Sequence, residues 1–341
     1  MQELSHSHHH GLDPSLEDTP LFGADRDIAP GEVMPLGVVT DSLDVAYVKP
    51  KKRGRVTFWI ATSWLGLVIF LAVFADFLPF VHSYSAGSVL DGKEPPSLQH
   101  WMGTDVNGRD IFSRWVYGAR VSLTIGAVAI VFGLLVGGFL GLLAGYHRKR
   151  TDTLIVTIMD ILLAFPALVL ALMLVTFGQA PDGGDRHISL GPIHFTLSRF
   201  WLVVFVLGLL SIPPLTRIVR ASTMSFANRE FVMASRALGA KNGRVISREI
   251  LPNVVPPMLA FALTGLAVLI VAEGALAFLG LSVRPPRPSW GFMIFEGKNP
   301  LQSGQWWISL LPALFMFLTI LAINMIGDVA AKRFDIREAV G

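Results

Sequence analysis

The chain has 341 residues, of which 52% are hydrophobic and only 16% are charged, and its mean hydropathy is +0.56. Soluble globular chains carry about 25% charged residues, so this composition excludes an ordinary soluble domain and indicates an integral membrane protein. The formal net charge of +3 is typical of basic loops on one side of a membrane rather than of nucleic-acid binding, and the absence of cysteine excludes disulfides, thiol catalysis and cysteine metal sites.

The first 54 residues are predicted to form a disordered cytoplasmic tail with a basic end. They are polar, rich in Asp, Glu, Pro and Gly, and show no periodic apolar pattern. They lack the charged start, short apolar core and cleavage site of a signal peptide. The cluster of His6, His8, His9 and His10 fits either a weak metal site or an ordinary tail, and we favour the tail. The basic run Lys49–Arg55 borders the first apolar segment, which predicts an inner location for the tail.

Six apolar runs follow, each near the ~20 residues needed to cross the hydrocarbon of a bilayer. We predict six transmembrane helices, over residues 56–81, 121–146, 153–177, 199–219, 255–281 and 306–327. The chain then divides into a first helix with an outer segment (55–120), a five-helix core with a loop at 220–252 (121–328), and a cytoplasmic C-terminal tail (329–341). Pro213 and Pro214 are expected to break the fourth helix.

The connections between these runs differ in charge. Basic residues gather before the first run, at residues 148–150, in the 217–252 segment and after the last run, whereas the other connections are mixed in sign. Basic loops stay in the cytoplasm, so both termini are predicted to lie inside. A short ordered piece is also expected at residues 187–198, between the third and fourth spans.

Four glycines at intervals of four residues mark the second span: Gly133, Gly137, Gly141 and Gly145. Residues i and i+4 share a helix face, so this face is smooth and allows another helix to approach closely. The partner is either a helix of the same chain, which we favour, or a helix of a second subunit.

Three acidic residues lie inside predicted spans, where charge is costly and therefore informative. Asp76 lies near the outer end of the first span and is interpreted as interfacial, whereas the other two lie deeper. Asp160 lies about two turns into the third span, and Glu273 lies deep in the fifth. Each either lines a substrate path or makes a structural hydrogen bond or ion pair, for example with Arg217 or Arg220. We favour the structural role for Asp160 and leave both roles open for Glu273.

The sequence offers no evident site for chemistry of its own. The nearest match to a phosphate-binding loop is Gly87–Glu94, where Glu94 replaces the Ser or Thr that would bind magnesium, and no strand precedes it. Metalloprotease, nucleophile-elbow and dinucleotide motifs are missing, and the histidines are not at metal-ligand spacing. We therefore expect no catalysis, cofactor or metal in this chain. That leaves a carrier or channel driven by gradients, or one subunit of a machine powered by a partner.

The 217–252 segment favours the second alternative. It carries seven basic and two acidic residues between two apolar runs. We predict a helix that stops at Gly239, a turn, and a second helix that ends at Leu251 and Pro252 before the fifth span. A helix–turn–helix of this kind, rich in small side chains, suits close docking to another protein.

The same segment resembles the Glu-Ala-Ala loop of binding-protein-dependent ABC importer permeases. The matching residues are Met233-Ala234-Ser235, then Gly239, then Ile250-Leu251-Pro252. Met233 replaces the acid of that pattern, Ser235 replaces its second alanine, and the isoleucine stands one place later than usual.

Further segments narrow the resemblance to the C-type permease subunit of dipeptide, oligopeptide and nickel importers. Residues 103–123 are similar to an outer signature of that subunit, which here contains Gly103, Thr104, Asp105, Gly108, Arg109 and Asp110. Residues 164–172, 277–294 and 324–337 are similar to its third-span, outer-loop and C-terminal motifs. The resemblance covers about residues 55–338, with the N-terminal tail and residues 182–198 as additions.

This resemblance implies an all-α membrane protein with the type I ABC importer permease fold, six transmembrane helices and a cytoplasmic coupling helix. It implies a prokaryotic cell (inner) membrane location and a complex with a sister permease, two ATPase subunits that bind ATP and magnesium, and an extracytoplasmic solute-binding protein. The implied substrate is a di- or oligopeptide. Nickel or haem within the same family, and a secondary carrier or channel working alone, are the alternatives.

Coupling to the ATPase subunits is the role that the resemblance implies for the 229–252 segment. Phe231, Ala234 and Leu238 stand at i, i+3 and i+7, which gives a narrow apolar stripe. Small side chains beside the stripe would let the helix lie deep in a groove. The residues expected to take part are Phe231, Met233, Ala234, Ser235, Arg236, Leu238, Gly239, Ala240, Leu251 and Pro252.

Overall fold

The computed structural model describes residues 54–180, 185–190 and 193–335 of the chain. The predicted tail with its histidine cluster, and Arg337 at the other end, lie outside the described residues. The elements in chain order are α1 (Gly54–Phe74), η2 (Ala75–Phe77), η3 (Val89–Asp91), α2 (Ile111–His147), α3 (Lys149–Leu163), α4 (Ala167–Gly178), β1 (Arg186–Leu190), β2 (Ile193–Leu197), α5 (Arg199–Phe226), α6 (Glu230–Ala237), α7 (Asn242–Arg244), η4 (Val245–Ile250), α8 (Leu251–Phe278), α9 (Trp290–Glu296), α10 (Lys298–Gln302) and α11 (Trp307–Asp335).

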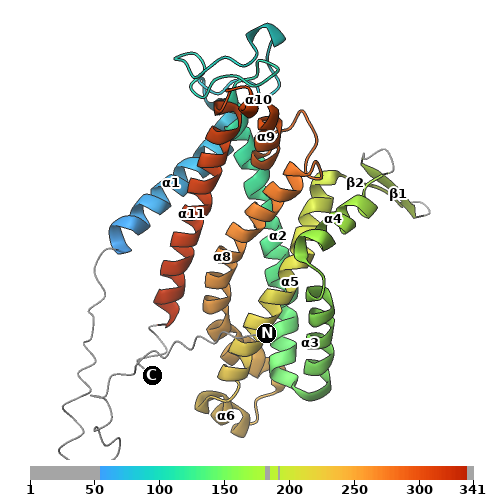
Figure 1. Ribbon diagram of the computed structural model, residues 1–341. Helices are drawn as coiled ribbons and strands as arrows, with labels where there is room; N and C mark the ends of the chain where they lie inside the picture. The colour runs from blue at the N-terminus through green and yellow to red at the C-terminus, as the bar shows by residue number, and fades with distance from the viewer. Residues whose placement is uncertain (1–53, 181–184, 191–192, 336–341) are drawn as a thin grey trace, which may run out of the picture. The chain divides into compact units, whose positions relative to one another are not determined.

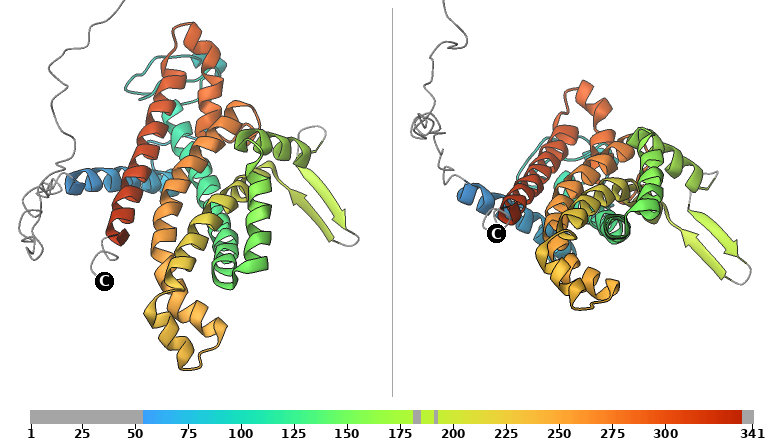
Figure 2. Two further views of the ribbon diagram at one scale, coloured as in Figure 1. Left: turned by 60° about the horizontal axis from the view of Figure 1, so that its bottom comes forward. Right: turned by 90° about the horizontal axis from the view of Figure 1, so that it is seen from below.

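Long apolar helices dominate this part of the chain. Among the described residues, five helices are long and apolar enough to cross a membrane, and the bent pair α3–α4 makes a sixth if it counts as one span. α5 packs along α2, α8 packs against α2, α5 and α11, and α1 lies against α11 (Figures 1 and 2). The α-helical fold expected from the sequence is therefore confirmed.

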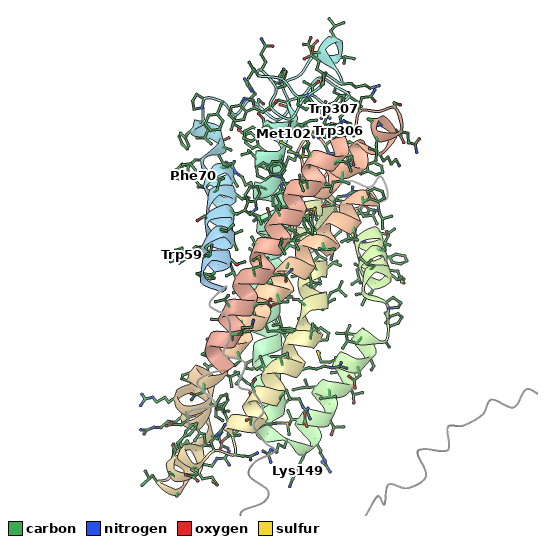
Figure 3. All side chains as sticks on the ribbon, turned by 60° about the vertical axis from the view of Figure 1, so that its left-hand side comes forward. Trp59, Phe70, Met102, Lys149, Trp306 and Trp307 are labelled. Carbon is green, nitrogen blue, oxygen red and sulfur yellow. The ribbon has the colours of Figure 1, made fainter. Side chains whose placement is uncertain are left out.

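The helices have two distinct ends (Figure 1). One end carries α6 and the turn between α2 and α3, and we call it the α6 end. The other carries residues 79–110 together with α9 and α10, and we call it the α9 end. Figure 3 places Lys149 at the first end and Met102, Trp306 and Trp307 at the second. Trp59 and Phe70 project outward from α1 and are exposed, as expected for side chains that face lipid.

α2 begins ten residues earlier than its predicted start at residue 121. Asp110 is its N-cap, and its Oδ2 accepts hydrogen bonds from the Ser113 backbone N–H (2.7 Å) and hydroxyl (2.6 Å). Such a cap satisfies an otherwise unpaired donor of the first turn. The sequence assigns this stretch to the outer segment, but its polar residues Arg114, Tyr117 and Arg120 all find hydrogen-bond partners within the fold.

The third predicted span is two helices with an 84° bend between them. α3 ends at Leu163 and α4 begins at Ala167. Pro166 explains the break, because a proline disfavours helical geometry in the residue before it and cannot supply the backbone donor of a continuing helix.

The expected break at Pro213 and Pro214 is absent, since α5 is helical from Arg199 to Phe226. Prolines are tolerated in membrane helices where neighbouring helices and hydroxyl side chains support the backbone. Here Ser211 Oγ donates to the Gly208 carbonyl (2.7 Å) and Thr216 Oγ1 to the Ile212 carbonyl (2.8 Å). Both prolines also lie in the stretch of α5 that packs on α2.

The four-residue glycine repeat of α2 is the surface on which α5 packs. A Cβ atom at Gly137 would lie 2.8 Å from the Ile212 carbonyl oxygen, and one at Gly141 would lie 2.7 Å from that of Thr216. Gly133 and Gly145 approach Ser211 and Thr223 in the same way. The partner of this glycine seam is thus a helix of the same chain, the alternative favoured from the sequence.

The ordered piece expected at residues 187–198 is a β-hairpin. β1 and β2 pair antiparallel, from Arg186 opposite Leu197 to Leu190 opposite Ile193. The hairpin extends away from the helices between α4 and α5 (Figure 1). Arg186 Nη1 donates to the Phe177 carbonyl (2.9 Å), which fixes the first strand to the end of α4.

Candidate functional sites

α6 is a short helix with a well-defined beginning and end. Glu230 in its first turn and Arg236 in its last turn have the charges that a helix dipole favours at those positions. At the end, the Gly239 N–H donates to the Arg236 carbonyl (2.9 Å) and the Ala240 N–H to the Ser235 carbonyl (3.1 Å). Gly239 has a φ of +84°, so this paired-bond stop needs a glycine. The predicted helix stop is confirmed.

One face of α6 is fixed to the transmembrane helices. Val232 is fully buried and packs in an apolar cluster that also contains Val219, Ala227, Val245, Ile250 and Val254. Tyr146 at the end of α2 hydrogen-bonds Asn242 (2.8 Å) and stacks under the guanidinium of Arg236, 5.1 Å from its ring centre. The helix is therefore held from α2, α5 and α8.

The opposite face of α6 exposes apolar side chains. Phe231 is 41% exposed, Met233 54% and Leu238 90%. Ala234 is also exposed, as is Arg236 beside the Tyr146 ring, while Ser235 and Ala240 are partly buried. Large apolar side chains on a polar end of a membrane protein, on an element with a firmly packed back, are typical of a protein–protein contact.

The second predicted helix does not end at Leu251 and Pro252. The chain is helical without interruption from Asn242 to Phe278, through the π-helical turn η4. Pro252 lies at the start of α8, directly after this π turn. The wider π turn directly before it relieves the clash between a proline ring and the carbonyl one turn back. Leu251 and Pro252 thus join α6 to the fifth span through a continuous helix.

The signature residues Gly103 to Asp110 form a buried turn at the α9 end. Asp105 Oδ1 accepts from the backbone N–H groups of Asn107 (2.8 Å) and Arg109 (3.0 Å). Thr104 Oγ1 donates to the Asp91 carbonyl (2.7 Å). Gly108 has a φ of +72°, and a Cβ there would lie 1.9 Å from the Ser88 carbonyl oxygen. The pattern therefore encodes a tightly packed turn.

A four-member ion cluster ties this turn to α9. Arg109 Nε donates to Asp105 (2.7 Å) and its Nη2 to Glu296 (3.0 Å). Arg114 bridges the same two carboxylates, with 2.6 Å to Glu296. Arg114 and Asp105 are almost fully buried. Each buried charge thus has partners of opposite sign, the condition under which burial of charge is tolerated.

Glu273 is completely buried at the junction of α2, α8 and the segment after α8. Its carboxylate accepts from the hydroxyls of Ser122 (2.9 Å) and Ser282 (2.7 Å). Ser122 in turn accepts from the Trp290 backbone N–H (3.2 Å). In this conformation Glu273 fixes the 279–289 segment to the helices.

Asp160 lies on α3 and forms an ion pair with Arg217 of α5, at 2.5 Å. Both side chains are about half exposed. Asp152 pairs in the same way with Arg220, one turn further along α5. The structure therefore brings Asp160 together with one of its two expected partners, and it places Asp160 and Glu273 in separate surroundings.

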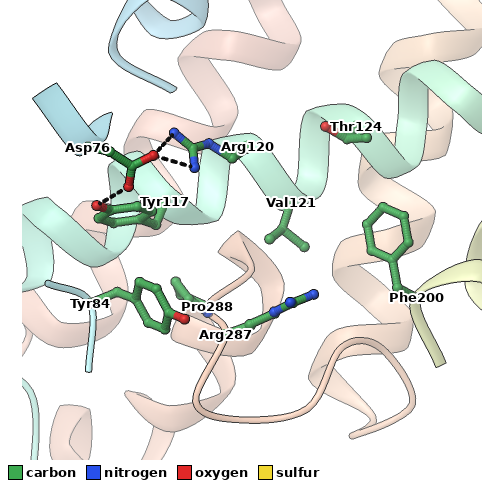
Figure 4. A pocket seen from close by; sticks show the side chains of 9 residues that line it. All are labelled: Asp76, Tyr84, Tyr117, Arg120, Val121, Thr124, Phe200, Arg287 and Pro288. Atoms are coloured by element: carbon green, nitrogen blue, oxygen red, sulfur yellow. Dashed lines mark hydrogen bonds and ion pairs between the residues drawn. The ribbon is translucent and has the colours of Figure 1, made fainter. Parts of the chain in front are cut away.

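A cavity of about 440 Å³ opens at the α9 end, and we call it the Arg287 cavity. Its lining comes from η2, α2, the start of α5 and two connecting segments (Figure 4). The lining residues are Asp76, Tyr84, Tyr117, Arg120, Val121, Thr124, Phe200, Arg287 and Pro288. Charged side chains, hydroxyl groups and aromatic rings come together in this cavity.

Comparison with known proteins places this arrangement in a family. Residues 137–339 match the family described as the binding-protein-dependent transport system inner membrane component. The chain belongs to this family. The dipeptide transport system permease protein of Alkalihalophilus pseudofirmus is 38% identical over 84% of this chain and 87% of its own length. The di/tripeptide transport system permease protein of Pseudomonas aeruginosa is 36% identical over 79% of this chain and 84% of its own length.

A solved structure supports the permease fold. The chain resembles the methionine ABC transporter MetNI in an inward-facing conformation, with a TM-score of 0.51 and 17% identity. The match covers 65% of this permease and 96% of that chain. At this identity the likeness concerns the fold alone.

The phosphate-loop-like segment of the permease, Gly87–Glu94, is packed into the signature turn. It contains the short helix η3, and the Glu94 N–H donates to Thr104 Oγ1 (2.8 Å). Across residues 54–180, 185–190 and 193–335, no group of three or more His, Asp or Glu side chains is arranged to hold a metal ion.

The Arg287 cavity was not predicted from the permease sequence. Arg120 and Arg287 stand in two of the resembling segments, 103–123 and 277–294, but neither was singled out. Their proximity depends on α2 meeting the segment after α8, which no spacing in the chain reveals. The available signal was a pair of arginines beside predicted spans, where charge points to function.

Proposed function

We propose that this permease is the membrane subunit of an ATP-driven importer for di- and oligopeptides, and that α6 is its coupling helix. The observation that carries the proposal is the construction of α6. Its back is locked to three transmembrane helices through Val232 and Tyr146, while Phe231, Met233 and Leu238 are exposed on its front. A displacement imposed on the front of α6 must therefore reach the spans. The printed functions of the dipeptide and di/tripeptide relatives support the substrate class.

The proposed complex contains a sister permease, two ATPase subunits and an extracytoplasmic solute-binding protein. ATP and magnesium bind to the ATPase subunits, and this subunit carries neither a cofactor nor a catalytic site of its own. The ATPase groove receives the exposed face of α6, and closure of the ATPases moves α6 together with η4 and α8. Met233 stands where the resembling loop has an acid, so the contact depends on shape and on Arg236 more than on a carboxylate.

The proposed site of action is the cell (inner) membrane, with the α6 end and both termini in the cytoplasm. The basic residues at the α6 end support this orientation, among them Arg148, Lys149 and Arg150 in the α2–α3 turn. The Arg287 cavity then faces the side from which a binding protein delivers solute.

Uptake by the reconstituted complex tests the proposal. The permease, its sister subunit, the ATPases and the binding protein are placed in proteoliposomes, and uptake of a labelled dipeptide is followed with and without ATP. We expect ATP-dependent uptake that requires every component. Flux through this chain alone would identify a carrier or channel instead, and ATP-dependent uptake of nickel or haem without peptide would replace the substrate class.

A further inference from the structure

The Arg287 cavity has one wall whose charges are already paired. Asp76 accepts a hydrogen bond from the Tyr117 hydroxyl (2.8 Å) and forms an ion pair with Arg120 (3.0 Å). Arg120 also donates to the carbonyls of Ala72 (2.8 Å) and Val73 (3.2 Å), the last turn of α1. Arg120 is thus engaged by α1 and Asp76, and this wall is close to electrically neutral.

The facing wall carries a cation that is not paired. Among the described residues, Arg287 forms no ion pair and no hydrogen bond that would engage its guanidinium. Figure 4 shows this guanidinium extending past Val121 towards Phe200, into the space that the cavity encloses. With Asp76 and Arg120 offsetting each other, the net charge of the lining residues is +1 from Arg287.

The backbone that carries Arg287 is held firmly on both sides. Pro288, Ser289 and Trp290 follow it directly and are buried, and the Trp290 indole N–H donates to the Trp115 carbonyl (3.1 Å). Ser282, before it, is fixed by Glu273. The flanking contacts therefore hold the backbone near Arg287, while its side chain is exposed and accessible to a ligand. The fork of an arginine matches a carboxylate through two parallel hydrogen bonds.

Aromatic rings supply the remaining surface. Tyr84 packs edge-on against Tyr117 with ring centres 5.0 Å apart, and Phe200 closes the side towards α5. Rings of this kind present apolar area beside hydroxyl groups. Within the described part of the chain, the cavity therefore combines the unpaired Arg287 with hydroxyl groups and apolar walls, which suits a small organic anion better than an inorganic cation.

We propose that the Arg287 cavity is a subsite of the permease for the terminal carboxylate of the transported peptide, with Arg287 as the residue that receives it. This assignment rests on the proposed function. A lipid phosphate shares the anionic chemistry that Arg287 recognises, so the test has to separate an anion that travels with the solute from one that belongs to the bilayer.

The test compares a dipeptide with its C-terminal amide in the reconstituted complex. Uptake of each labelled compound is measured at concentrations that saturate the binding protein, for the wild-type complex and for Arg287→Gln. The binding protein is the same in both complexes, so its own preference cancels when the acid-to-amide uptake ratios are compared. We expect Arg287→Gln to lower uptake of the acid about tenfold, as for loss of a charge-assisted hydrogen bond, and to leave uptake of the amide within twofold.

Two further variants sharpen the test. Arg287→Lys keeps the charge without the fork and should retain part of the preference for the acid. Arg284→Gln removes an exposed charge from the same segment outside the cavity lining, and should leave the ratio unchanged. Assembly of each complex is checked by co-purification with the ATPases.

Equal loss of acid and amide uptake in Arg287→Gln would overturn the subsite and indicate a lipid or purely structural contact. An unchanged ratio would overturn it as well. A wild-type complex that moves no peptide would instead overturn the proposed function, so the two failures are distinguishable.

Discussion

Gly239 occupies a backbone conformation that residues with a Cβ atom adopt only with strain. Its φ is +84°, and a Cβ there would meet no atom within 4 Å. The requirement for glycine is therefore one of conformation rather than of space. Because the N–H groups of Gly239 and Ala240 close α6 through two backbone hydrogen bonds, the conformation of Gly239 sets the direction in which the chain leaves that helix.

We predict that Gly239→Val uncouples ATP hydrolysis from peptide uptake while the complex still assembles. A side chain on a residue in this left-handed region causes strain of about 1–2 kcal/mol. The backbone at the C-terminal end of α6 can relieve this strain only by changing its conformation. Gly243→Val is the matched control, because Gly243 also has open space around it but no positive φ. ATPase rate and uptake are measured on the same proteoliposomes. Uptake that stays proportional to ATPase activity in Gly239→Val would contradict the coupling role.

Single residues differ in how far their surroundings could be foreseen. The pair of Asp160 with Arg217 followed from the cost of charge within a span and from the nearest available cations. The partners of Glu273 did not, because Ser122 and Ser282 are common residues that only the packing of α2 against α8 brings to it. Whether either acid also contacts substrate stays a prediction.

At the scale of elements, α2 and α5 are joined through the glycine seam at backbone distance. The periodicity of the glycines indicated the seam, and the packing identified its partner. The π turn and the unbroken α5 could not be foreseen, because local propensity rules read Pro213, Pro214 and Pro252 as breaks, and tertiary packing overrides them.

We predict that Gly141→Ala destabilises the protein by about 1–3 kcal/mol, the usual cost of overpacking a tight contact. The new Cβ would lie 2.7 Å from both the Thr216 carbonyl oxygen and the Val219 Cβ, and the backbone oxygen cannot swing aside. Gly66→Ala in α1 is the control, since nothing lies within 4 Å of its Cβ position and alanine favours helix formation. Thermal unfolding of the purified complex in one detergent compares the two, and equal midpoints would contradict the seam.

At the scale of the whole molecule, the two ends of the described helices have different chemistry. Basic side chains such as Lys149 gather at the α6 end, whereas the α9 end carries the buried ion cluster and the tryptophans Trp306 and Trp307. The order of spans could be predicted from apolar length, whereas the sidedness inferred from basic loops stays a prediction. The compact packing of residues 79–110 could not, because it depends on Glu296, which lies nearly two hundred positions beyond Arg109 and Arg114 in the sequence.

The orientation can be tested directly because the chain contains no cysteine. Leu90 at the α9 end is 96% exposed, and Thr151 at the α6 end is exposed as well. In spheroplasts, we expect a membrane-impermeant maleimide to label Leu90→Cys at once and Thr151→Cys only after permeabilisation. The cysteine-free parent is the blank for both. Labelling of Thr151→Cys in intact spheroplasts would reverse the proposed topology.

The glycine seam also keeps α5 straight. Its contacts lie on both sides of Pro213 and Pro214, where α5 lacks two backbone donors and would otherwise bend. With this support from α2, the 28 residues of α5 form a continuous rod about 42 Å long. One end of the rod leads into α6, and its first turn places Phe200 in the wall of the Arg287 cavity. A tilt of one degree about the α6 end would displace the far end by about 0.7 Å, which is how a small motion at α6 would reach the residue that lines the cavity.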